Sequence, residues 1–141
     1  MIVLDTNVIS ALMRREPDPA VAAWIDRQPA SSIWTTSITL FEVQFGLERM
    51  PRGRRREALR QAFELVVAED LAGRVLDFDP GAAAAAASIA STLAARGRPI
   101  DVRDVQIAGI VSAARGRLAT RNGRHFEGAE LELVDPWAPG D

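Results

Sequence analysis

The 141-residue chain contains no cysteine and no lysine, and it has a single histidine. The lack of cysteine excludes disulfide bonds, thiolate zinc sites and cysteine nucleophiles. All 17 basic residues are arginine, which excludes any mechanism that needs a catalytic lysine. A chain without cysteine suits a reducing compartment, and we expect a cytoplasmic protein.

Long apolar segments and a basic excess are also missing. The longest uncharged run, 80–95, is mostly alanine and is too short and weakly apolar to span a bilayer, so we expect no membrane association. The opening MIVLDT has no basic or long apolar region, so we expect no signal peptide. The net charge of −2 argues against a protein that coats nucleic acid, but it permits an enzyme that contacts a few phosphates.

Apolar residues make up 48% of the chain and charged residues 26%, which is typical of a globular protein. The length predicts a single domain over residues 1–141. Short apolar segments alternate with segments of helical periodicity. The predicted strands cover 2–4, 32–35, 74–78, 118–120 and 131–134, and the predicted helices cover 5–14, 19–28, 36–50, 54–67, 80–95 and 101–115. This alternation predicts an α/β fold whose parallel sheet is covered by helices on both faces.

Acidic side chains lie near the ends of these predicted strands. Asp5 directly follows the first strand, and Glu42 lies in the first turns of the helix after the second strand. Asp101 and Asp104 lie in the first turn of the last predicted helix, and the polar segment 120–122 follows the fourth strand. The carboxyl ends of parallel strands meet at one edge of a sheet, where ligands bind. The sequence therefore predicts that these groups converge.

Convergence of Asp5, Glu42 and Asp104 would favour metal-dependent chemistry. Each negative charge would raise the pKa of its neighbours unless a cation neutralised them. Carboxylate oxygens are hard ligands that suit Mg²⁺ or Mn²⁺. Such an ion polarises a scissile phosphate and lowers the pKa of a water, so an all-carboxylate site predicts a phosphodiester hydrolase.

Each acid also has a purely structural explanation. Asp5 can cap the first helix, and Thr39-x-x-Glu42 can form a capping box. Asp101-x-x-Asp104 can supply a helix cap followed by a first-turn acid, and we interpret Asp101 as this cap. The functional hypothesis therefore depends on the joint placement of the acids at one sheet edge.

Four segments, in order and spacing, resemble the PIN-domain ribonucleases, and most closely the VapC-type toxins of bacterial toxin–antitoxin pairs. They are LDTNVIS, TTSITLFEVQFGLERMPRGRRR, GRPIDVRDVQIAGIVSAARG and LATRNGRHFEG. The resemblance, which runs nearly end to end, implies a PIN-like three-layer α/β/α sandwich with a short, mostly parallel sheet of four to five strands. It also implies an endoribonuclease that depends on Mg²⁺ or Mn²⁺.

The resemblance assigns the catalytic and metal-binding roles to three acids, which are Asp5, Glu42 and Asp104. It also matches Thr6 to a hydroxyl that orients the first aspartate. Many relatives carry a fourth acid in the segment 120–126, where this chain has Asn122 and His125. The fourth ligand and the number of ions therefore stay open. Asn122 can hydrogen-bond a water held by the ion, and we expect His125 at the surface or behind a ligand.

The arginines around the third and fourth predicted helices form the most basic part of the chain. Arg52, Arg54 and Arg55 are candidate contacts to the RNA backbone, because guanidinium groups pair well with phosphate. The alternative is that these arginines are only solvent-exposed side chains at the start of a helix. The RNA would have to be single-stranded or looped for one phosphodiester to reach the site.

The resemblance further implies a homodimer and a cognate antitoxin that assembles with it into a hetero-oligomer. The antitoxin would bind in a groove between the early helices. Ile9, Leu12 and Trp24 are candidate apolar contacts in that groove, and the alternative is that they belong to the core.

Two rival functions remain for comparison. Enzymes that use a strand-end aspartate as a phosphoryl acceptor generally need a lysine, and the dehalogenase-like ones need an acid where this chain has Asn7, so this hypothesis is set aside. The second rival is a catalytically weak PIN-like domain that acts as a protein-binding module. RNA cleavage in the presence of a divalent ion distinguishes that module from a nuclease.

Overall fold

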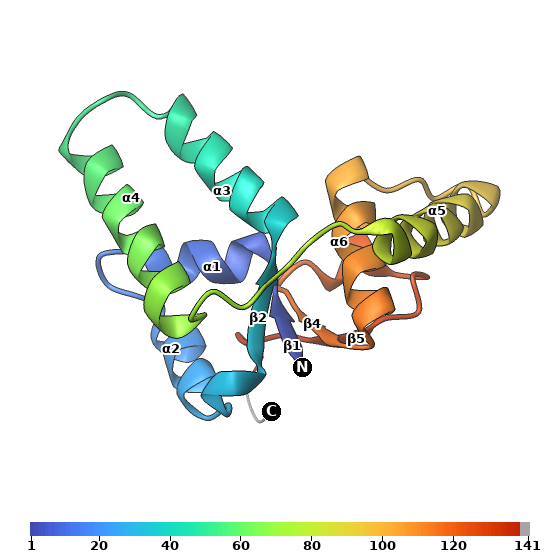
Figure 1. Ribbon diagram of the computed structural model, residues 1–141, viewed down its shortest axis with the longest axis horizontal. Coiled ribbons are helices and arrows are strands. Elements are labelled where there is room, and N and C mark those ends of the chain that lie inside the picture. The colour runs from blue at the N-terminus through green and yellow to red at the C-terminus, as the bar shows by residue number, and fades with distance from the viewer. Residues whose placement is uncertain (139–141) are drawn as a thin grey trace.

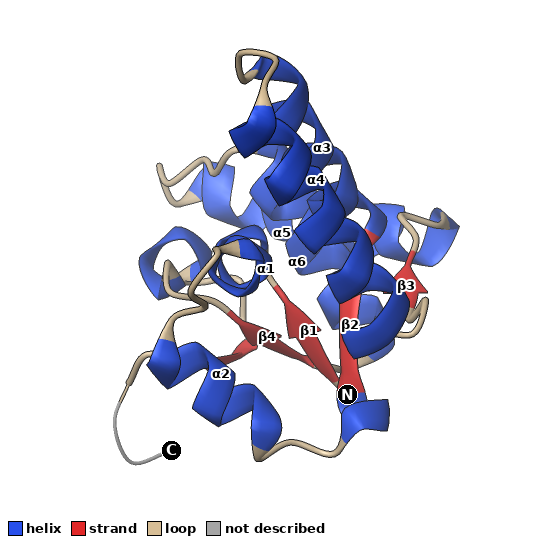
Figure 2. Ribbon diagram, turned by 90° about the vertical axis from the view of Figure 1, so that its left-hand side faces the viewer, coloured by secondary structure: helices blue, strands red, loops and turns tan. Residues whose placement is uncertain are grey.

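The computed structural model describes residues 1–138, so the last three residues of the predicted domain lie outside the described part. Five strands form one sheet in the order β3-β2-β1-β4-β5, and every neighbouring pair is parallel. The strands are β1 (Ile2–Leu4), β2 (Ile33–Thr36), β3 (Val75–Leu76), β4 (Arg117–Ala119) and β5 (Glu132–Val134). Figure 2, which looks at one face of the sheet, shows β4, β1 and β2 side by side. The predicted parallel sheet is therefore confirmed.

Helices cover both faces of the sheet (Figure 1). The helices are α1 (Thr6–Met13), α2 (Pro19–Asp26), α3 (Ser37–Arg49), α4 (Arg54–Leu65), α5 (Pro80–Ala95) and α6 (Val102–Ala114). Shorter helical turns occupy Ala30–Ser32, Val66–Asp70 and Gly123–Phe126. In Figure 1, α1 to α4 lie on one side of the strands and α5 and α6 on the other. The three-layer α/β/α sandwich is confirmed.

Strand β1 explains why the sheet has two apolar faces. Ile2 and Leu4 pack into a cluster that also holds Val8 and Ile9 of α1. Val3 points to the opposite face, into a second cluster that includes Ile107 of α6. Side chains alternate along a strand, so a strand that is apolar throughout must be covered on both sides.

The apolar residues that were candidate antitoxin contacts belong to this core. Ile9 is 0% exposed and Trp24 is 3% exposed, and the partly buried Leu12 packs against the same cluster. The alternative of a core role is thus confirmed, and the expectation of an exposed contact is wrong for Ile9 and Trp24. Their burial stabilises the packing of α1 and α2 against the sheet.

Most predicted elements differ from the structure by one or two residues at an end, and the third strand and the fourth helix are two examples. The third strand is Val75–Leu76 instead of 74–78, and the side chain of Arg74 beside it donates hydrogen bonds to the carbonyl oxygens of Ile33 (2.7 Å) and Ala30 (2.6 Å). The fourth helix was expected to extend to residue 67, but it changes at Val66 into a π-helical turn. The periodicity of the side chains predicts neither the short strand nor the π-helical turn.

Among residues 1–138, no helix is long and apolar enough to cross a membrane.

Candidate active site

The three predicted acids line one pocket at the carboxyl edge of the sheet. Asp5 enters it from the junction of β1 and α1, Glu42 from the second turn of α3, and Asp104 from the first turn of α6. The pocket has a volume of about 410 Å³, and we call it the acidic pocket. Its lining residues are Asp5, Thr6, Asn7, Glu42, Asp101, Arg103, Asp104, Asn122 and His125.

Asp5 is almost fully buried, with 5% of its surface exposed. Its Oδ1 accepts a hydrogen bond from the backbone N–H of Thr6 at 2.8 Å, so the residue caps α1 as one alternative predicted. Its Oδ2 accepts hydrogen bonds from the hydroxyl of Thr120 (2.7 Å) and from Nδ2 of Asn7 (3.3 Å). Capping and a ligand role are compatible, because a carboxylate offers about four lone-pair positions.

Asn7 and Thr120 form a polar network that fixes Asp5. Asn7 Nδ2 also donates to the Thr120 hydroxyl at 3.2 Å, and Asn7 Oδ1 accepts from the backbone N–H of Arg121 at 3.1 Å. The backbone N–H of Asn122 donates to the same hydroxyl at 3.0 Å. The sequence placed Thr120 at a strand end but assigned no role to it or to Asn7. Their proximity to Asp5 depends on β4 pairing with β1.

Thr6 was expected to orient Asp5 through its hydroxyl, and this prediction is wrong. The Thr6 hydroxyl donates to Glu42 Oε1 at 3.0 Å and lies 3.4 Å from the Thr39 hydroxyl. Only the Thr6 backbone contacts Asp5. Thr6 therefore links the first acid to the second, because α1 and α3 pack side by side.

The capping box predicted as an alternative for Glu42 does not form. Helix α3 is capped by Thr36, whose hydroxyl accepts a hydrogen bond from the backbone N–H of Thr39 at 3.0 Å. Glu42 lies beyond the first turn of α3 and does not cap the helix. Its nearest basic group in this pocket is Arg103, with Nη1 3.8 Å from Glu42 Oε2.

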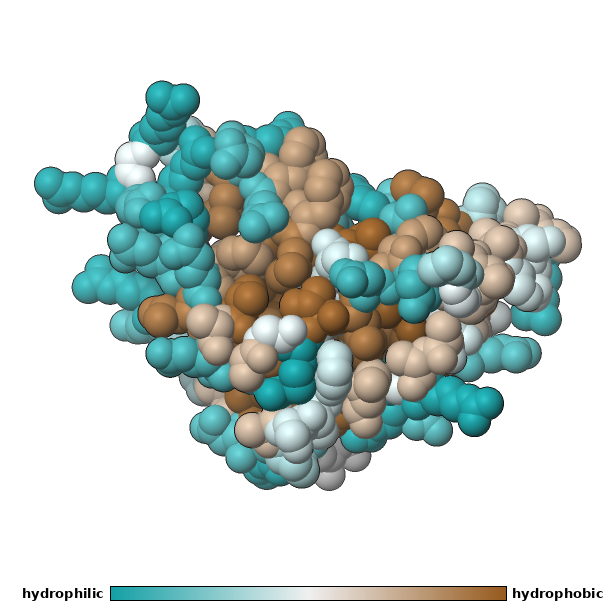
Figure 3. All heavy atoms as spheres, in the orientation of Figure 1, coloured by the Kyte–Doolittle hydropathy of each residue, from teal (hydrophilic) through white to brown (hydrophobic). Residues whose placement is uncertain are grey.

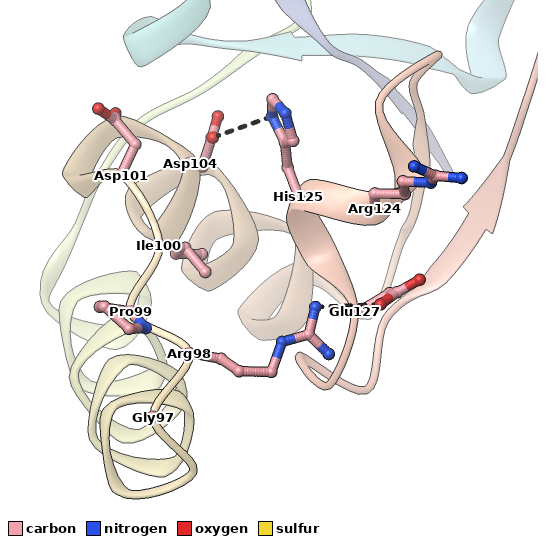
Figure 4. A pocket seen from close by; sticks show the side chains of 9 residues that line it. All are labelled: Gly97, Arg98, Pro99, Ile100, Asp101, Asp104, Arg124, His125 and Glu127. Atoms are coloured by element: carbon pink, nitrogen blue, oxygen red, sulfur yellow. Dashed lines mark hydrogen bonds and ion pairs between the residues drawn. The ribbon is translucent and has the colours of Figure 1, made fainter.

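Asp101 is the cap of the last helix, as the sequence predicted, and Asp104 lies in its first turn. Asp101 caps α6 by accepting a hydrogen bond from the backbone N–H of Arg103 at 2.9 Å. Asp104 projects from the first turn of α6, and its Oδ2 lies 3.5 Å from Nδ1 of His125 (Figure 4). The imidazole of His125 is 57% exposed, so this residue lies at the surface, one of its two expected positions, beside the Asp104 carboxylate.

The segment that holds a fourth acid in many relatives brings no carboxylate to the pocket. Asn122 and His125 occupy its wall instead. Asn122 was expected to support the site through its side chain, and the contact that the structure records is its backbone hydrogen bond to Thr120.

The predicted RNA-contact arginines lie elsewhere. Arg52 lines a pocket at the turn between α3 and α4. Arg54 and Arg55 line a further pocket beside the end of α1. The structure does not bring these three side chains to the acidic pocket.

Burial raises the proton affinity of all three acids, and repulsion by neighbouring acids adds to it at Glu42 and Asp104. Burial is the main cause that raises the pKa of Asp5, although its hydrogen bonds oppose the shift. Burial also raises the pKa of Glu42, and the charges of Asp5 and Asp104 add to the effect. The pKa of Asp104 is raised by burial first and by the charge of Asp5 second. A divalent cation would remove this cost.

The donor set fits a hard divalent ion. Carboxylate oxygens dominate the lining, and amide and hydroxyl oxygens supply the rest. Within residues 1–138, no group of three or more acidic or histidine side chains is close enough together to hold a metal ion by itself. An ion bound here would therefore take only part of its coordination from protein carboxylates and the remainder from solvent or phosphate.

The sequence matches the PIN domain family over residues 2–131. The chain belongs to the PIN-domain family. This PIN domain is 43% identical to the VapC ribonuclease Y4jK of Sinorhizobium fredii, with 99% of each chain covered. It is 33% identical to the toxin FitB of Neisseria gonorrhoeae, with 97% of this chain and 99% of FitB covered. A solved structure of FitAB bound to a DNA fragment superposes with a TM-score of 0.89 at 32% identity, covering 100% of this chain and 99% of that one.

Proposed function

We propose that this PIN domain is a metal-dependent endoribonuclease toxin that hydrolyses RNA phosphodiester bonds at the acidic pocket. The observation that carries the proposal is that Asp5, Glu42 and Asp104, which come from three separate elements, line the same pocket. The relatives named as VapC ribonuclease and toxin support the substrate class and the biological role.

Asp5, Glu42 and Asp104 are the residues that would hold Mg²⁺, with Mn²⁺ as an alternative. When bound, the ion supplies charge stabilisation at the phosphate and a more acidic water. Thr120 and Asn7 keep the Asp5 carboxylate in one orientation through their hydrogen bonds to Oδ2. Thr6 does the same for Glu42. The chain thereby presents oriented acids at the sheet edge before substrate arrives, which limits reorganisation during the reaction.

The substrate would be single-stranded or looped RNA, because a phosphodiester must enter an open pocket at the sheet edge. Arg52, Arg54 and Arg55 remain predicted contacts to more distant phosphates. They lie on α4 and the turn before it, beyond the far end of α3 from Glu42 (Figure 1).

The partner would be an antitoxin, since FitB-like structures are complexes of a toxin with a second protein. A pocket of about 590 Å³ between the end of α1 and α4 supports this proposal, because it combines an apolar floor with four arginines. Its lining residues are Met13, Arg14, Arg15, Arg54, Arg55, Ala58, Leu59 and Ala62. Such a surface suits an amphipathic acidic segment.

A homodimer would use the exposed apolar face of α3. Phe41 is 55% exposed and Phe45 is 45% exposed, and their rings stack with centroids 5.8 Å apart. Figure 3 shows apolar surface along α3 that continues into the middle of this side of the molecule. Exposed apolar patches of this kind mark interaction surfaces. Size-exclusion chromatography of the chain, alone and with the protein encoded beside it, tests both partners.

The decisive experiment is RNA cleavage with Mg²⁺ or Mn²⁺, with and without EDTA. We expect the wild-type chain to cleave, and we expect EDTA, Asp5→Asn or Asp104→Asn to abolish cleavage. Asp101→Asn is the matched control, because asparagine also caps helices and Asp101 is not a proposed ligand. Cleavage by a folded Asp104→Asn chain at the wild-type rate would refute the site. A wild-type chain that never cleaves would favour the protein-binding module instead.

A further inference from the structure

A second pocket, also of about 410 Å³, adjoins the acidic pocket (Figure 4). Asp101, Asp104 and His125 line both, so the two form one continuous depression. The remaining wall comes from the loop between α5 and α6 and from the segment between β4 and β5. Residues that line only this pocket, which we call the flanking pocket, are Gly97, Arg98, Pro99, Ile100, Arg124 and Glu127.

The flanking pocket differs from the acidic pocket in its chemistry. Pro99 and Ile100 supply apolar surface, and the ring of His125 stands on the opposite side in Figure 4. Arg98 crosses the bottom of the view toward Glu127, while the guanidinium of Arg124 extends away from the pocket. A flat ring, an apolar wall and a guanidinium are the groups that bind a nucleotide, because bases stack on rings and phosphates pair with arginine.

Arg98 is available to a phosphate. Its Nη2 lies 3.0 Å from Oε2 of Glu127, and the two side chains are 53% and 57% exposed. An exposed ion pair of this kind contributes little to stability. A phosphate can therefore displace Glu127 and form a charge-assisted pair with the guanidinium.

RNA needs such a contact close to the acidic pocket. An RNA strand carries a phosphate at every nucleotide, and the acidic pocket presents four acids with Arg103 as its one arginine. An ion can neutralise the acids around one phosphate only. The neighbouring phosphate therefore needs a basic partner nearby, and Arg98 lines the adjoining flanking pocket.

We propose that the flanking pocket binds the nucleotide next to the scissile phosphodiester, with its phosphate on Arg98 and its base between His125 and the Pro99–Ile100 wall. This inference rests on the proposed ribonuclease function and assigns the path of the strand beyond the cleavage point. Glu127 competes with the phosphate for Arg98 and so weakens RNA binding.

The test measures the anisotropy of a fluorescein-labelled single-stranded RNA on the full chain in EDTA, where no cleavage occurs. Arg98→Ala weakens binding roughly five- to tenfold, as expected for one charge-assisted contact. It also makes the slope of log affinity against log salt concentration shallower by about 0.7, because one phosphate contact is lost. Glu127→Gln strengthens binding in the wild-type background but not in the Arg98→Ala background. Arg117→Ala is the control: it removes one positive charge at the amino end of β4, away from the pocket, and should leave the RNA affinity unchanged.

Several outcomes would overturn the inference. One is an equal loss of RNA affinity in Arg98→Ala and Arg117→Ala, since Arg98 would then contribute only to the overall charge of the chain and not to a specific contact. Another is a gain in RNA affinity from Glu127→Gln that persists in the Arg98→Ala background, because Glu127 would then not act by competing with phosphate for Arg98. A pocket that serves a protein partner instead would leave RNA affinity unchanged in all variants. If the predicted order of affinities holds but no metal ion supports cleavage, the RNA pocket stands and the nuclease proposal fails.

Discussion

The Thr120 hydroxyl donates a 2.7 Å hydrogen bond to Oδ2 of Asp5, although 115 positions separate the two residues. The contact exists because β4 lies beside β1 in parallel register, with Ala119 opposite Leu4. Asp5 and Thr120, which directly follow these two residues, therefore lie next to each other at the carboxyl edge of the sheet. Thr120 also accepts hydrogen bonds from Asn7 and Asn122, so one hydroxyl connects three segments around the first acid.

Replacing this hydroxyl should lower activity. Thr120→Val keeps the shape but leaves Asp5 without its shortest hydrogen bond, and we expect cleavage to fall by about 10- to 100-fold, as for other residues that position metal ligands. The same bond lowers the pKa of Asp5, so its loss makes the carboxyl harder to ionise. Single-turnover cleavage on a folded variant measures the effect.

Thr35→Val is the matched control for that substitution. Thr35 is a buried threonine on β2 whose hydroxyl donates to the carbonyl oxygen of Leu4 at 2.9 Å, and it does not line the acidic pocket. We expect a loss of about 1 kcal/mol in stability with near-normal cleavage. Equal losses of activity in the two variants would contradict a positioning role for Thr120.

Mg²⁺ should stabilise the folded chain through the acids. An ion that binds only the folded state raises the free energy of unfolding by about 2.7 kcal/mol at a concentration of 100 times its Kd. We expect thermal unfolding to shift upward with Mg²⁺ in the wild type and in Asp101→Asn, but much less in Asp5→Asn and Asp104→Asn. A shift of equal size in all four proteins would show that the ion binds elsewhere.

Without metal, Asp104 should make stability depend on pH. Its pKa in the folded chain is raised above the ordinary value of 3.8 by burial and by Asp5. As the pH falls through the raised pKa, the folded chain takes up a proton before the unfolded chain does, which favours folding. This contribution is complete below 3.8 and is lost as the pH rises through the folded-state pKa.

Asp104→Asn should therefore be more stable than the wild type at neutral pH in EDTA, by less than about 1 kcal/mol because the group is partly solvated. The difference should shrink as the pH is lowered toward the ordinary carboxyl range. Urea unfolding at several pH values measures it. If the wild type were more stable than Asp104→Asn at neutral pH without metal, the ionised Asp104 would not be destabilising, and the repulsion inferred at this site would be wrong.

Gly109 should be essential for the packing of α6 on α5. A Cβ at this position would lie 2.5 Å from the carbonyl oxygen of Ala82 and 2.6 Å from Cβ of Ala86. Gly109→Ala should destabilise the chain by about 3 kcal/mol, since backbone atoms of α5 would have to move. Gly46→Ala on α3 meets no atom within 4 Å and should stabilise by about 0.5–1 kcal/mol. Similar unfolding midpoints for the two variants would refute the close contact.

Much of the fold followed from local patterns. The strand 2–4 is apolar at every position, which predicts burial on both faces, and Asp101 precedes an apolar periodic segment, which predicts a cap. These features depend on residues a few positions apart, so the sequence alone predicts them. The residue types narrowed the chemistry too, because a chain without lysine or cysteine excludes mechanisms that need a catalytic lysine or a cysteine nucleophile.

The tertiary structure decided which side chains meet. Sequence placed Thr6 beside Asp5, yet the Thr6 hydroxyl bonds to Glu42, and the donor to Asp5 comes instead from Thr120. These pairings depend on the strand order β3-β2-β1-β4-β5 and on the packing of α1 against α3. Periodicity and caps report only neighbours along the chain, whereas a hydrogen bond across 36 or 115 positions requires the sheet to be assembled first.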